Sequence, residues 1–324
     1  MSAVVLAYNR RDVVATVLDH LATLPIDEIV VADNGSWDGT ADIVRAHPSG
    51  AKLIEMGANV GIAARNRAAE AAHGEYLVML DDDSYPLPGA IEALLEVFAR
   101  QPRTGVLGGL VNDLDSRGRP VPNEQPGSFD WSLRSGRREP PPRDGFPATF
   151  FPEGACMLRR EAFFEVGGWF EPLFWIDLEL DLATRLLQRG WDVRYLPQAC
   201  FQHLPRPGPG TDFALRQRLR VRNRIWYFWL RFPPQLALTR VPGYLLFDLI
   251  ESVYRRAPGA WTGGIIDAWR QRDRIRGQRH PLSPELAHRA ELNQPRLHLE
   301  LLLPTFKRVV GRLLADRRAV ASRR

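Results

Sequence analysis

Three consecutive aspartates, Asp81–Asp83, have the type and spacing that most directly suggest chemistry in this sequence. They follow Tyr76–Leu80, a short apolar run typical of a strand that is buried on both faces of a parallel sheet. In an extended chain alternate side chains share a side, so Asp81 and Asp83 should project together while Asp82 points away. A hard divalent cation that also binds phosphate oxygens would suit such a pair. The alternative is a solvated acidic turn.

A second apolar run also ends in a carboxylate. Glu28–Ala32 leads directly into Asp33, which is followed by Asn-Gly-Ser. The carboxyl ends of parallel strands meet at one edge of a sheet, and open α/β sheets bind their ligands at that edge. Asp33 and Asp83 can therefore face one crevice, which favours a binding site over the acidic turn.

The elements that must position these aspartates alternate between strand and helix. Apolar runs predict strands at 3–7, 28–32, 51–55, 76–80 and 105–111, and helical spacing predicts helices at 13–24, 38–45, 62–73 and 88–100. This order is typical of the α/β class, with a doubly wound, mostly parallel sheet flanked by helices. Residues 112–149, rich in Pro, Gly and Arg, form a connection so long that it either flanks the active site or is a disordered insert.

Further acidic residues lie in Phe174–Arg185. Asp177 and Asp181 are four residues apart and share a face if this segment is helical, whereas Glu179 points elsewhere. At a junction between loop and helix the three carboxylates could converge; the alternative is a solvated helix face. Just upstream, the paired glycines of Gly167-Gly168-Trp169 would let the backbone approach a ligand closely.

Charge is distributed unevenly along the 324 residues. Residues 1–204 hold 19 Lys and Arg against 29 Asp and Glu, whereas residues 205–324 hold 24 against 9. A basic tail on an acidic body predicts an anionic partner, either a membrane surface or nucleic acid. The alternating arginines at 216–224 precede an aromatic run, which fits an amphipathic element on an anionic membrane or a helical cap with its own core. Residues 236–250 are apolar but contain Arg, Pro and Asp, so they fall short of a membrane span.

The cysteines and the N-terminus indicate a compartment. Cys156 and Cys200 have no metal-ligand spacing, which argues against a zinc site or a disulfide scaffold and fits a reducing cytosol. Met1 leads straight into an apolar strand, so we expect no signal peptide. The expected location is cytoplasmic, and the basic tail suggests peripheral attachment to the inner face of the cell membrane. The oligomeric state is left open, with a homo-oligomer among the options.

Taken in order, these segments resemble the inverting nucleotide-sugar glycosyltransferases of family 2, which have the GT-A fold. The resemblance covers roughly residues 3–204 and rests on VVLAYNR, VADNGSWDGT, NVGIAARN, LDDDSYP and FPEGACMLRREAFFEVGGWFE. It implies a GT-A catalytic domain over 1–204, with a nucleotide-sugar half at about 1–111 and an acceptor half at about 150–204. A basic, aromatic-rich and mainly helical region would occupy 205–324, beginning with the linker PRPGPG.

The resemblance also implies roles for individual residues. Asp33 would hold the pyrimidine base, Asp81 the ribose or the metal, and Asp83 would chelate Mg²⁺ or Mn²⁺ on the diphosphate. His203 would complete the metal site, although without the resemblance it reads as a structural histidine. Glu179 would be the general base, and Asp177 is the other candidate because the family often has two adjacent acids there. The remaining donor-site residues would be Ala7, Tyr8, Asn9, Arg10, Gly61, Arg65 and Asp82, and the acceptor-site residues would be Gly154, Ala155, Gly168 and Trp169.

The implied activity is transfer of a sugar from a nucleoside-diphosphate sugar, of UDP or dTDP type, to a hydroxyl of a saccharide or lipid-linked acceptor in cell-envelope glycan synthesis. Rhamnose and galactofuranose are among the donor sugars left open. A sugar-phosphate nucleotidyltransferase is the rival enzyme, but Tyr8-Asn9-Arg10 stands where its Gly-rich phosphate loop would be expected. A nucleic-acid-binding protein that uses the Arg-rich tail would leave the aspartates unexplained, so no nucleic-acid partner is expected.

Overall fold

The computed structural model describes residues 1–114, 119–122, 142–204 and 212–287. Within it the chain forms two compact units, Met1–Gly210 and Thr211–Arg324, which are described separately below. The expected linker at 205–210 and most of the long connection at 112–149 lie outside the described residues, as does the end of the basic tail from residue 288.

The first unit is built on one ten-stranded mixed sheet. Its main path has the order β3-β2-β1-β4-β9-β6-β10-β5, while β7 pairs with β6 and β8 with β10. The strands are β1 (Ser2–Ala7), β2 (Glu28–Asp33), β3 (Lys52–Glu55), β4 (Tyr76–Asp81), β5 (Ser84–Pro86), β6 (Thr104–Leu114), β7 (Pro120–Pro122), β8 (Phe146–Pro147), β9 (Ala155–Arg159) and β10 (Asp192–His203). Strands β3, β2, β1 and β4 run parallel, as the alternation of strand and helix predicts.

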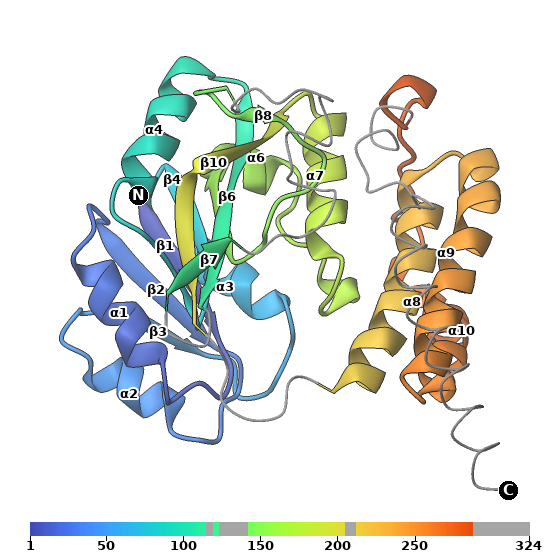
Figure 1. Ribbon diagram of the computed structural model, residues 1–324, viewed down its shortest axis with the longest axis horizontal. Helices are drawn as coiled ribbons and strands as arrows, with labels where there is room; N and C mark the ends of the chain where they lie inside the picture. Colours follow the sequence, from blue (N-terminus) through green and yellow to red (C-terminus); the bar gives the residue numbers. More distant parts are fainter. Residues whose placement is uncertain (115–118, 123–141, 205–211, 288–324) are drawn as a thin grey trace, which may run out of the picture. The chain divides into compact units, whose positions relative to one another are not determined.

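Helices cover both faces of this sheet (Figure 1). On one face lie α1 (Val14–Ala22), α2 (Thr40–Ala46) and α4 (Ala90–Arg100), and on the other lie α3 (Ala63–Ala71), α6 (Arg160–Glu165) and α7 (Leu178–Gln188). The first face packs as one apolar cluster in which Val5, Val31 and Val78 of the strands meet Leu18 and Leu94 of the helices. Burial of this kind, at about 25 cal/mol per Å² of apolar surface, holds the strand ends in fixed positions.

Strand β9 departs from the doubly wound pattern because it runs antiparallel to both of its neighbours. It pairs with β4 through Tyr76↔Arg159 to Leu80↔Ala155, and with β6 through Val106↔Leu158 to Gly108↔Cys156. Strand β5 is also antiparallel, pairing with the end of β10 through His203↔Ser84. As a result, segments that are far apart in sequence reach the carboxyl end of β4.

The second unit consists of α8 (Phe213–Arg231), α9 (Pro234–Tyr254), α10 (Pro258–Arg270) and the short 3₁₀ turn Arg272–Ile275. The aromatic run of α8 is mostly internal, with Trp226, Tyr227 and Phe228 buried and Trp229 exposed. No helix in the described part of the chain combines the length and the hydrophobicity that a membrane-spanning segment requires.

The arginines of α8 are largely engaged within this second unit. Arg218 makes a bidentate pair with Asp267 of α10, at 2.5 and 2.8 Å. Arg220 pairs with Glu251 at 3.0 Å, and Arg224 pairs with the fully buried Asp248 at 2.6 Å. The sequence left two interpretations open for this run, a helical cap with its own core and an amphipathic element on a membrane. These contacts within the unit favour the helical cap.

Candidate active site

Asp33 lies at the end of β2, in register with Ala7 of β1, and is almost completely buried. One carboxylate oxygen, Oδ2, accepts a hydrogen bond from the backbone N–H of Ser36 at 3.0 Å. The other, Oδ1, is buried without a hydrogen-bond partner in the described structure. Buried polar atoms are normally satisfied, so Asp33 retains an acceptor that a ligand could use.

The segment Tyr8–Arg10 follows β1 and links two neighbouring loops. The Tyr8 N–H donates to Asp82 Oδ2 at 2.7 Å, and the Asn9 N–H donates to Ser36 Oγ at 2.9 Å. Asn9 has φ 54°, in the left-handed region, and its side-chain oxygen accepts from the N–H of Trp37 at 3.0 Å. These bonds place the segment beside both Asp33 and the acidic turn, although no Gly-rich loop is present.

The three aspartates do not form the extended run that the sequence suggested. Strand β4 ends at Asp81, the chain turns at Asp82 and Asp83, and β5 begins at Ser84. The turn is closed by the Asp81 N–H, which donates to Ser84 Oγ at 3.0 Å. Strict alternation therefore stops at Asp81. Asp82 is not directed away from the site but is buried against the Tyr8 N–H, and burial, then the neighbouring Asp83, raises its pKa well above the usual range.

Asp81 is held by Arg65 of α3, whose side chain is completely buried. Its guanidinium contacts Asp81 Oδ1 and donates to the carbonyls of Leu80 at 3.0 Å and Glu153 at 3.2 Å. A Cβ on Gly154 would lie 2.1 Å from Asp81 Oδ2, so the backbone of the β8–β9 loop touches this carboxylate directly. Ala155, the first residue of β9, is buried behind it. Arg65 thus ties three segments together at the carboxyl end of β4.

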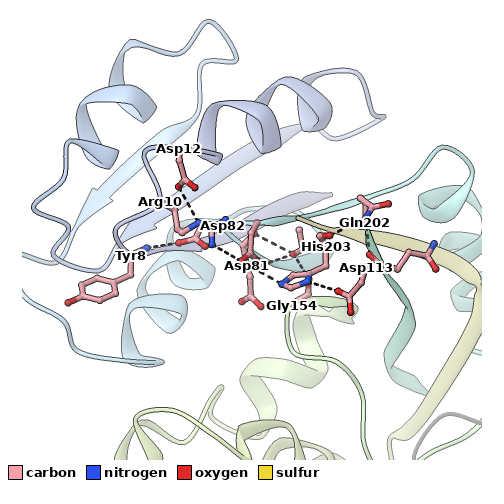
Figure 2. Close-up of polar contacts among 12 residues, drawn as sticks. Tyr8, Arg10, Asp12, Asp81, Asp82, Asp113, Gly154, Gln202 and His203 are labelled. Carbon is pink, nitrogen blue, oxygen red and sulfur yellow. Dashed lines mark hydrogen bonds and ion pairs between the residues drawn. The ribbon is translucent and has the colours of Figure 1, made fainter. Parts of the chain in front are cut away.

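Asp83 has different partners. Its Oδ2 lies 3.2 Å from Arg10 Nη1 and 3.6 Å from His203 Nε2, and His203 Nδ1 is 2.7 Å from Asp113 Oδ1 (Figure 2). Interaction with the Asp83 carboxylate, and then with that of Asp113, raises the pKa of His203 to about 9. The structure therefore brings His203 to Asp83, while Asp81 is engaged on Arg65 instead of forming the expected pair with Asp83.

The chemistry of Asp83 and His203 fits a divalent cation that is shared with a substrate. In the described ranges, no three His, Cys, Asp or Glu side chains are grouped as a complete metal centre. Mg²⁺ in proteins is commonly bound by one or two side chains while substrate phosphates and water fill the remaining positions. Asp83 and His203, whose Oδ2 and Nε2 atoms are 3.6 Å apart, would supply two such side-chain ligands.

A second cluster of carboxyl groups lies where the chain enters α7. Asp177 is the residue preceding that helix, with φ 60°, and Glu179 is in its first turn. Asp181 is buried and pairs with Arg185 at 2.7 Å, so it belongs to the framework of the helix. Phe174 and Ile176 also have positive φ, at 65° and 71°, and strain of this kind concentrates at functional sites.

Glu153, on the loop before β9, joins Asp177 and Glu179 in this cluster. Burial raises the pKa of Glu153 to about 7 against the opposing attraction of Arg65. Burial, and then repulsion from Glu153 and Asp177, raises the pKa of Glu179 well above its usual range. Glu153 Oε2 and Asp177 Oδ2 are buried without a hydrogen-bond partner in the described structure. The cluster therefore contains a carboxyl group able to take up a proton near neutral pH.

The remaining residues implied by the resemblance have framework contacts. Trp169 is only 1% exposed and packs with Phe151 and Phe163, and its indole Nε1 is buried without a hydrogen-bond partner in the described structure. Both backbone groups of Trp169 bond to the side-chain amide of Asn66 at 2.9 Å. Gly168 lies against that amide, and a Cβ there would approach its oxygen to 2.8 Å.

Gly61 likewise makes a tight contact between two segments. It has φ 65°, and a Cβ at this position would lie 2.3 Å from the carbonyl oxygen of Phe174. The next residue, Ile62, donates its N–H to that same carbonyl at 2.8 Å. The start of α3 therefore supports the strained loop that carries Asp177.

Two residues of the site were not identified from the sequence, Glu153 and Asp113. Glu153 is a single acid in a loop without periodicity, and the only local signal is that it precedes Gly154. Asp113 lies near the end of β6, a strand that the sequence predicted to end at 111. Extending that strand by its alternation would have placed Asp113 at the same edge of the sheet as the other aspartates.

Comparison with known proteins identifies the family of the chain. Residues 2–167 match the sequence profile of the family described as "Glycosyl transferase family 2". An "N-acetylglucosaminyl-diphospho-decaprenol L-rhamnosyltransferase" of Mycobacterium tuberculosis is 32% identical over 240 residues, which cover 65% of this chain and 76% of that protein. A "Pre-mycofactocin glycosyltransferase" of the same organism is 29% identical over 54% of this chain and 37% of the relative.

Solved structures share the fold. Staphylococcus aureus TarS residues 1–349, in complex with UDP-GlcNAc, superposes with a TM-score of 0.58 at 15% identity, covering 82% of this chain and 80% of that one. The mannosyltransferase PcManGT of Pyrobaculum calidifontis, in complex with GDP-Man and Mn²⁺, gives a TM-score of 0.54 at 18% identity, with coverage of 96% and 81%. Both similarities concern the arrangement of strands and helices.

Proposed function

The chain belongs to glycosyltransferase family 2, and from that premise we propose that it transfers a sugar from a UDP- or dTDP-linked donor to a hydroxyl of a saccharide or lipid-linked acceptor, with metal dependence and inversion. The observation that carries the proposal is the placement of Asp33 at the carboxyl end of β2, and of Asp81 and Asp83 at and just beyond the carboxyl end of β4; these two parallel strands flank β1. That edge is where open α/β sheets bind nucleotides. The rhamnosyltransferase relative, whose name includes a lipid-linked diphosphate saccharide, supports a role in cell-envelope glycan synthesis.

The proposed donor site begins at Asp33. Its buried, unpartnered Oδ1 would accept a hydrogen bond from an N–H of the pyrimidine base. A base without a donor at that position would leave this buried oxygen unsatisfied and would bind more weakly. Asp81, the more exposed of the strand-end carboxylates, would bind the ribose hydroxyls while Arg65 fixes its orientation. Segment Tyr8–Arg10 and the backbone at Gly61 would line the same side.

Asp83 and His203 would hold Mg²⁺ or Mn²⁺, and the diphosphate would supply further ligands. A bound divalent cation neutralises the charge that develops on the departing diphosphate. PcManGT, which shares the fold, was solved with Mn²⁺. To bind a metal through Nε2, His203 must lose a proton from that nitrogen, and its Nδ1 contact with Asp113 then fixes the ring.

The base in this proposal is Glu179. As the acceptor oxygen forms its bond to the anomeric carbon, the bond from that carbon to the diphosphate oxygen breaks and its electron pair leaves with the nucleoside diphosphate. The hydroxyl proton passes to the Glu179 carboxylate, whose pKa is raised by burial and by repulsion from Glu153 and Asp177, so that it binds a proton more strongly than an ordinary carboxylate. A single displacement inverts the anomeric centre and needs no nucleophile from the protein. Asp177 is the alternative base.

The family membership does not favour a sugar-phosphate nucleotidyltransferase. A nucleic-acid-binding role for the tail is also weakened, because Arg218, Arg220 and Arg224 pair with carboxylates inside the second unit. Both alternatives nevertheless make distinct predictions in the test below.

Peripheral contact with an anionic membrane is part of the proposal, and the surface we propose for it is on α9. Leu238, Leu246 and Val253 are exposed by 76%, 58% and 57%, and their spacings of eight and seven residues place them on one face of the helix. The sequence of the second unit is basic, with 24 Lys and Arg against 9 Asp and Glu over residues 205–324. An exposed apolar face on a basic unit suits a negatively charged lipid surface, where a lipid-linked acceptor would be found.

The test is binding and turnover with a panel of UDP-, dTDP- and GDP-sugars, each with and without Mn²⁺ or Mg²⁺, alongside a duplex DNA titration. We expect metal-dependent binding of a pyrimidine nucleotide sugar and slow donor hydrolysis in the absence of acceptor. Asp83→Ala should abolish the metal dependence while circular dichroism shows a native spectrum, because a carboxylate at the end of a strand contributes little to packing. Binding of DNA but of no nucleotide sugar would contradict the proposal, and pyrophosphate release from nucleoside triphosphates would indicate the rival enzyme.

A further inference from the structure

Arg10 is a buried cation placed between two carboxylates. Its side chain is 2% exposed, with Nη1 3.2 Å from Asp83 Oδ2 and Nε 3.4 Å from Asp12 Oδ1 (Figure 2). Its backbone is fixed as well, because its N–H donates to Thr40 Oγ1 at 2.9 Å and its carbonyl accepts from Val14 at 3.0 Å. Arg10 is therefore held both at its backbone and at its guanidinium.

The hydrogen-bonding capacity of Arg10 is not fully used. A guanidinium carries five N–H donors, and both Nε and Nη2 of Arg10 are buried without a hydrogen-bond partner in the described structure. Buried donors of this kind cost free energy unless a ligand satisfies them. Arg10 and Asp33 thus share one property: each has a buried polar atom without a hydrogen-bond partner in the described structure.

The oxygen that Arg10 contacts is also the one nearest to His203. Asp83 Oδ2 lies 3.2 Å from Arg10 Nη1 and 3.6 Å from His203 Nε2, so a metal held by Asp83 and His203 would bind a carboxylate that the guanidinium also contacts. Two cations on a single carboxylate repel each other, and the repulsion is strong where water is excluded. A diphosphate removes that repulsion because it can accept hydrogen bonds from the guanidinium and coordinate the metal at once.

We propose that Arg10 is a resident counter-cation of Asp83 that competes with the divalent metal, and that it moves from Asp83 to the donor diphosphate when metal and donor bind together. Asp12 Oδ1 forms an ion pair with Nε at 3.4 Å, although without a hydrogen bond, and this attraction can persist while the guanidinium rotates away from Asp83. This inference rests on the metal site proposed above. Its consequence is that metal and nucleotide each bind weakly alone and strengthen each other, because coupling between two binding sites is reciprocal.

The experiment measures the Mn²⁺ dissociation constant by titration calorimetry, without nucleotide and with saturating UDP or dTDP. Arg10→Gln should bind Mn²⁺ about tenfold more tightly than the wild type without nucleotide, a difference of about 1.4 kcal/mol. The strengthening by nucleotide should shrink by a similar factor. Arg11→Gln is the matched control because it makes the same charge change one residue away, where the side chain is exposed and donates to the Asp38 carbonyl at 3.3 Å. It should behave as the wild type.

A second variant tests the competition in the opposite direction. Asp12→Asn removes the other anchor of Arg10, so the guanidinium should rest more firmly on Asp83 and metal binding without nucleotide should weaken severalfold. Unchanged or weaker Mn²⁺ binding by a natively folded Arg10→Gln would overturn the inference, as would unchanged or tighter binding by Asp12→Asn if the first variant does not fold. Failure of the metal site itself would look different: the wild type would not bind Mn²⁺ under either condition, or Asp83→Asn would bind it normally.

Discussion

At the scale of single residues, the carboxylates around α7 offer the most direct test of the reaction. Proton removal from an attacking hydroxyl typically contributes ~10²–10⁴-fold to a rate. Glu179→Gln keeps the size of the side chain but cannot accept the proton, so turnover should fall by about that factor while donor affinity stays near the wild-type value. Measuring transfer rate and nucleotide affinity separates the two effects.

Asp177→Asn is the control for this assignment. If it abolishes turnover while Glu179→Gln remains active, the base is Asp177. Full activity in both variants would contradict general-base catalysis by this cluster. Asp181→Asn is not a suitable substitute, because it would break the buried pair with Arg185 and disturb the helix.

Glu153 should govern the pH dependence of turnover. Glu179 acts as a base only when deprotonated, so its raised pKa predicts that kcat falls as pH decreases through that pKa. Repulsion from Glu153 is one cause of the raised value, and Glu153→Gln removes it. The acidic limb of the profile should therefore move to lower pH, and more activity should be retained in mild acid. A limb that stays in place, or moves to higher pH, would contradict the proposed repulsion between the two carboxyl groups.

At the scale of secondary-structure elements, the contact between α3 and the loop before α7 determines whether the base is positioned. Gly61→Ala would place a Cβ 2.3 Å from the Phe174 carbonyl, which must shift and take the strained loop with it. We expect a loss of stability of about 1–3 kcal/mol and a fall in kcat larger than the change in nucleotide affinity. Thermal denaturation and steady-state kinetics measure the two effects.

Gly57 supplies a control for backbone strain alone. It has φ 71°, close to that of Gly61, but a Cβ there would meet nothing within 4 Å. Gly57→Ala should therefore cost stability through its φ without lowering kcat. An equal fall in kcat for both variants would mean that the loop before α7 does not depend on the Gly61 contact.

How far the sequence predicts each element depends on the range of the contacts that define it. Strands β1 to β4 and helices α1 to α4 follow from local apolar spacing, and so does the placement of Asp33 and Asp81 at strand ends. Strand character around β9 is also visible locally, but its antiparallel pairing and the short β5 are not, because they depend on contacts with β4, β6 and β10, which are distant in sequence.

The same limit applies to the site residues. The turn at Asp82–Asp83 interrupts the alternation on which their expected orientation depended. Counter-charges for the aspartates could be expected in general terms, but only the folded chain shows that Arg65 takes Asp81 and Arg10 takes Asp83. Glu153 joins the cluster through chain topology, for which its local sequence gives no pattern.

At the scale of the whole molecule, the proposed membrane surface of α9 can be tested with the full chain. Leu246→Asp places a charge in the exposed apolar face, so it should reduce co-sedimentation with vesicles of anionic lipid severalfold without lowering activity on a soluble acceptor. Thr262→Asp makes the same charge change at an exposed polar position on α10 and should bind like the wild type. If the wild-type protein does not co-sediment with anionic vesicles, or binds neutral vesicles equally well, the proposed charge-assisted attachment is wrong.

The antiparallel strand β9 also has a consequence for how the protein is made. Strands β4 and β6 are not neighbours in the finished sheet, because β9 lies between them and pairs with both. During synthesis the ribosome releases β4 and β6 well before residues 155–159, so β4 must wait with one edge unpaired. An open edge of this kind is a template for aggregation. The same late segment delivers the Glu153 carbonyl to Arg65, so closing this edge of β4 and completing the contacts of Arg65 become one event in the life of the nascent chain.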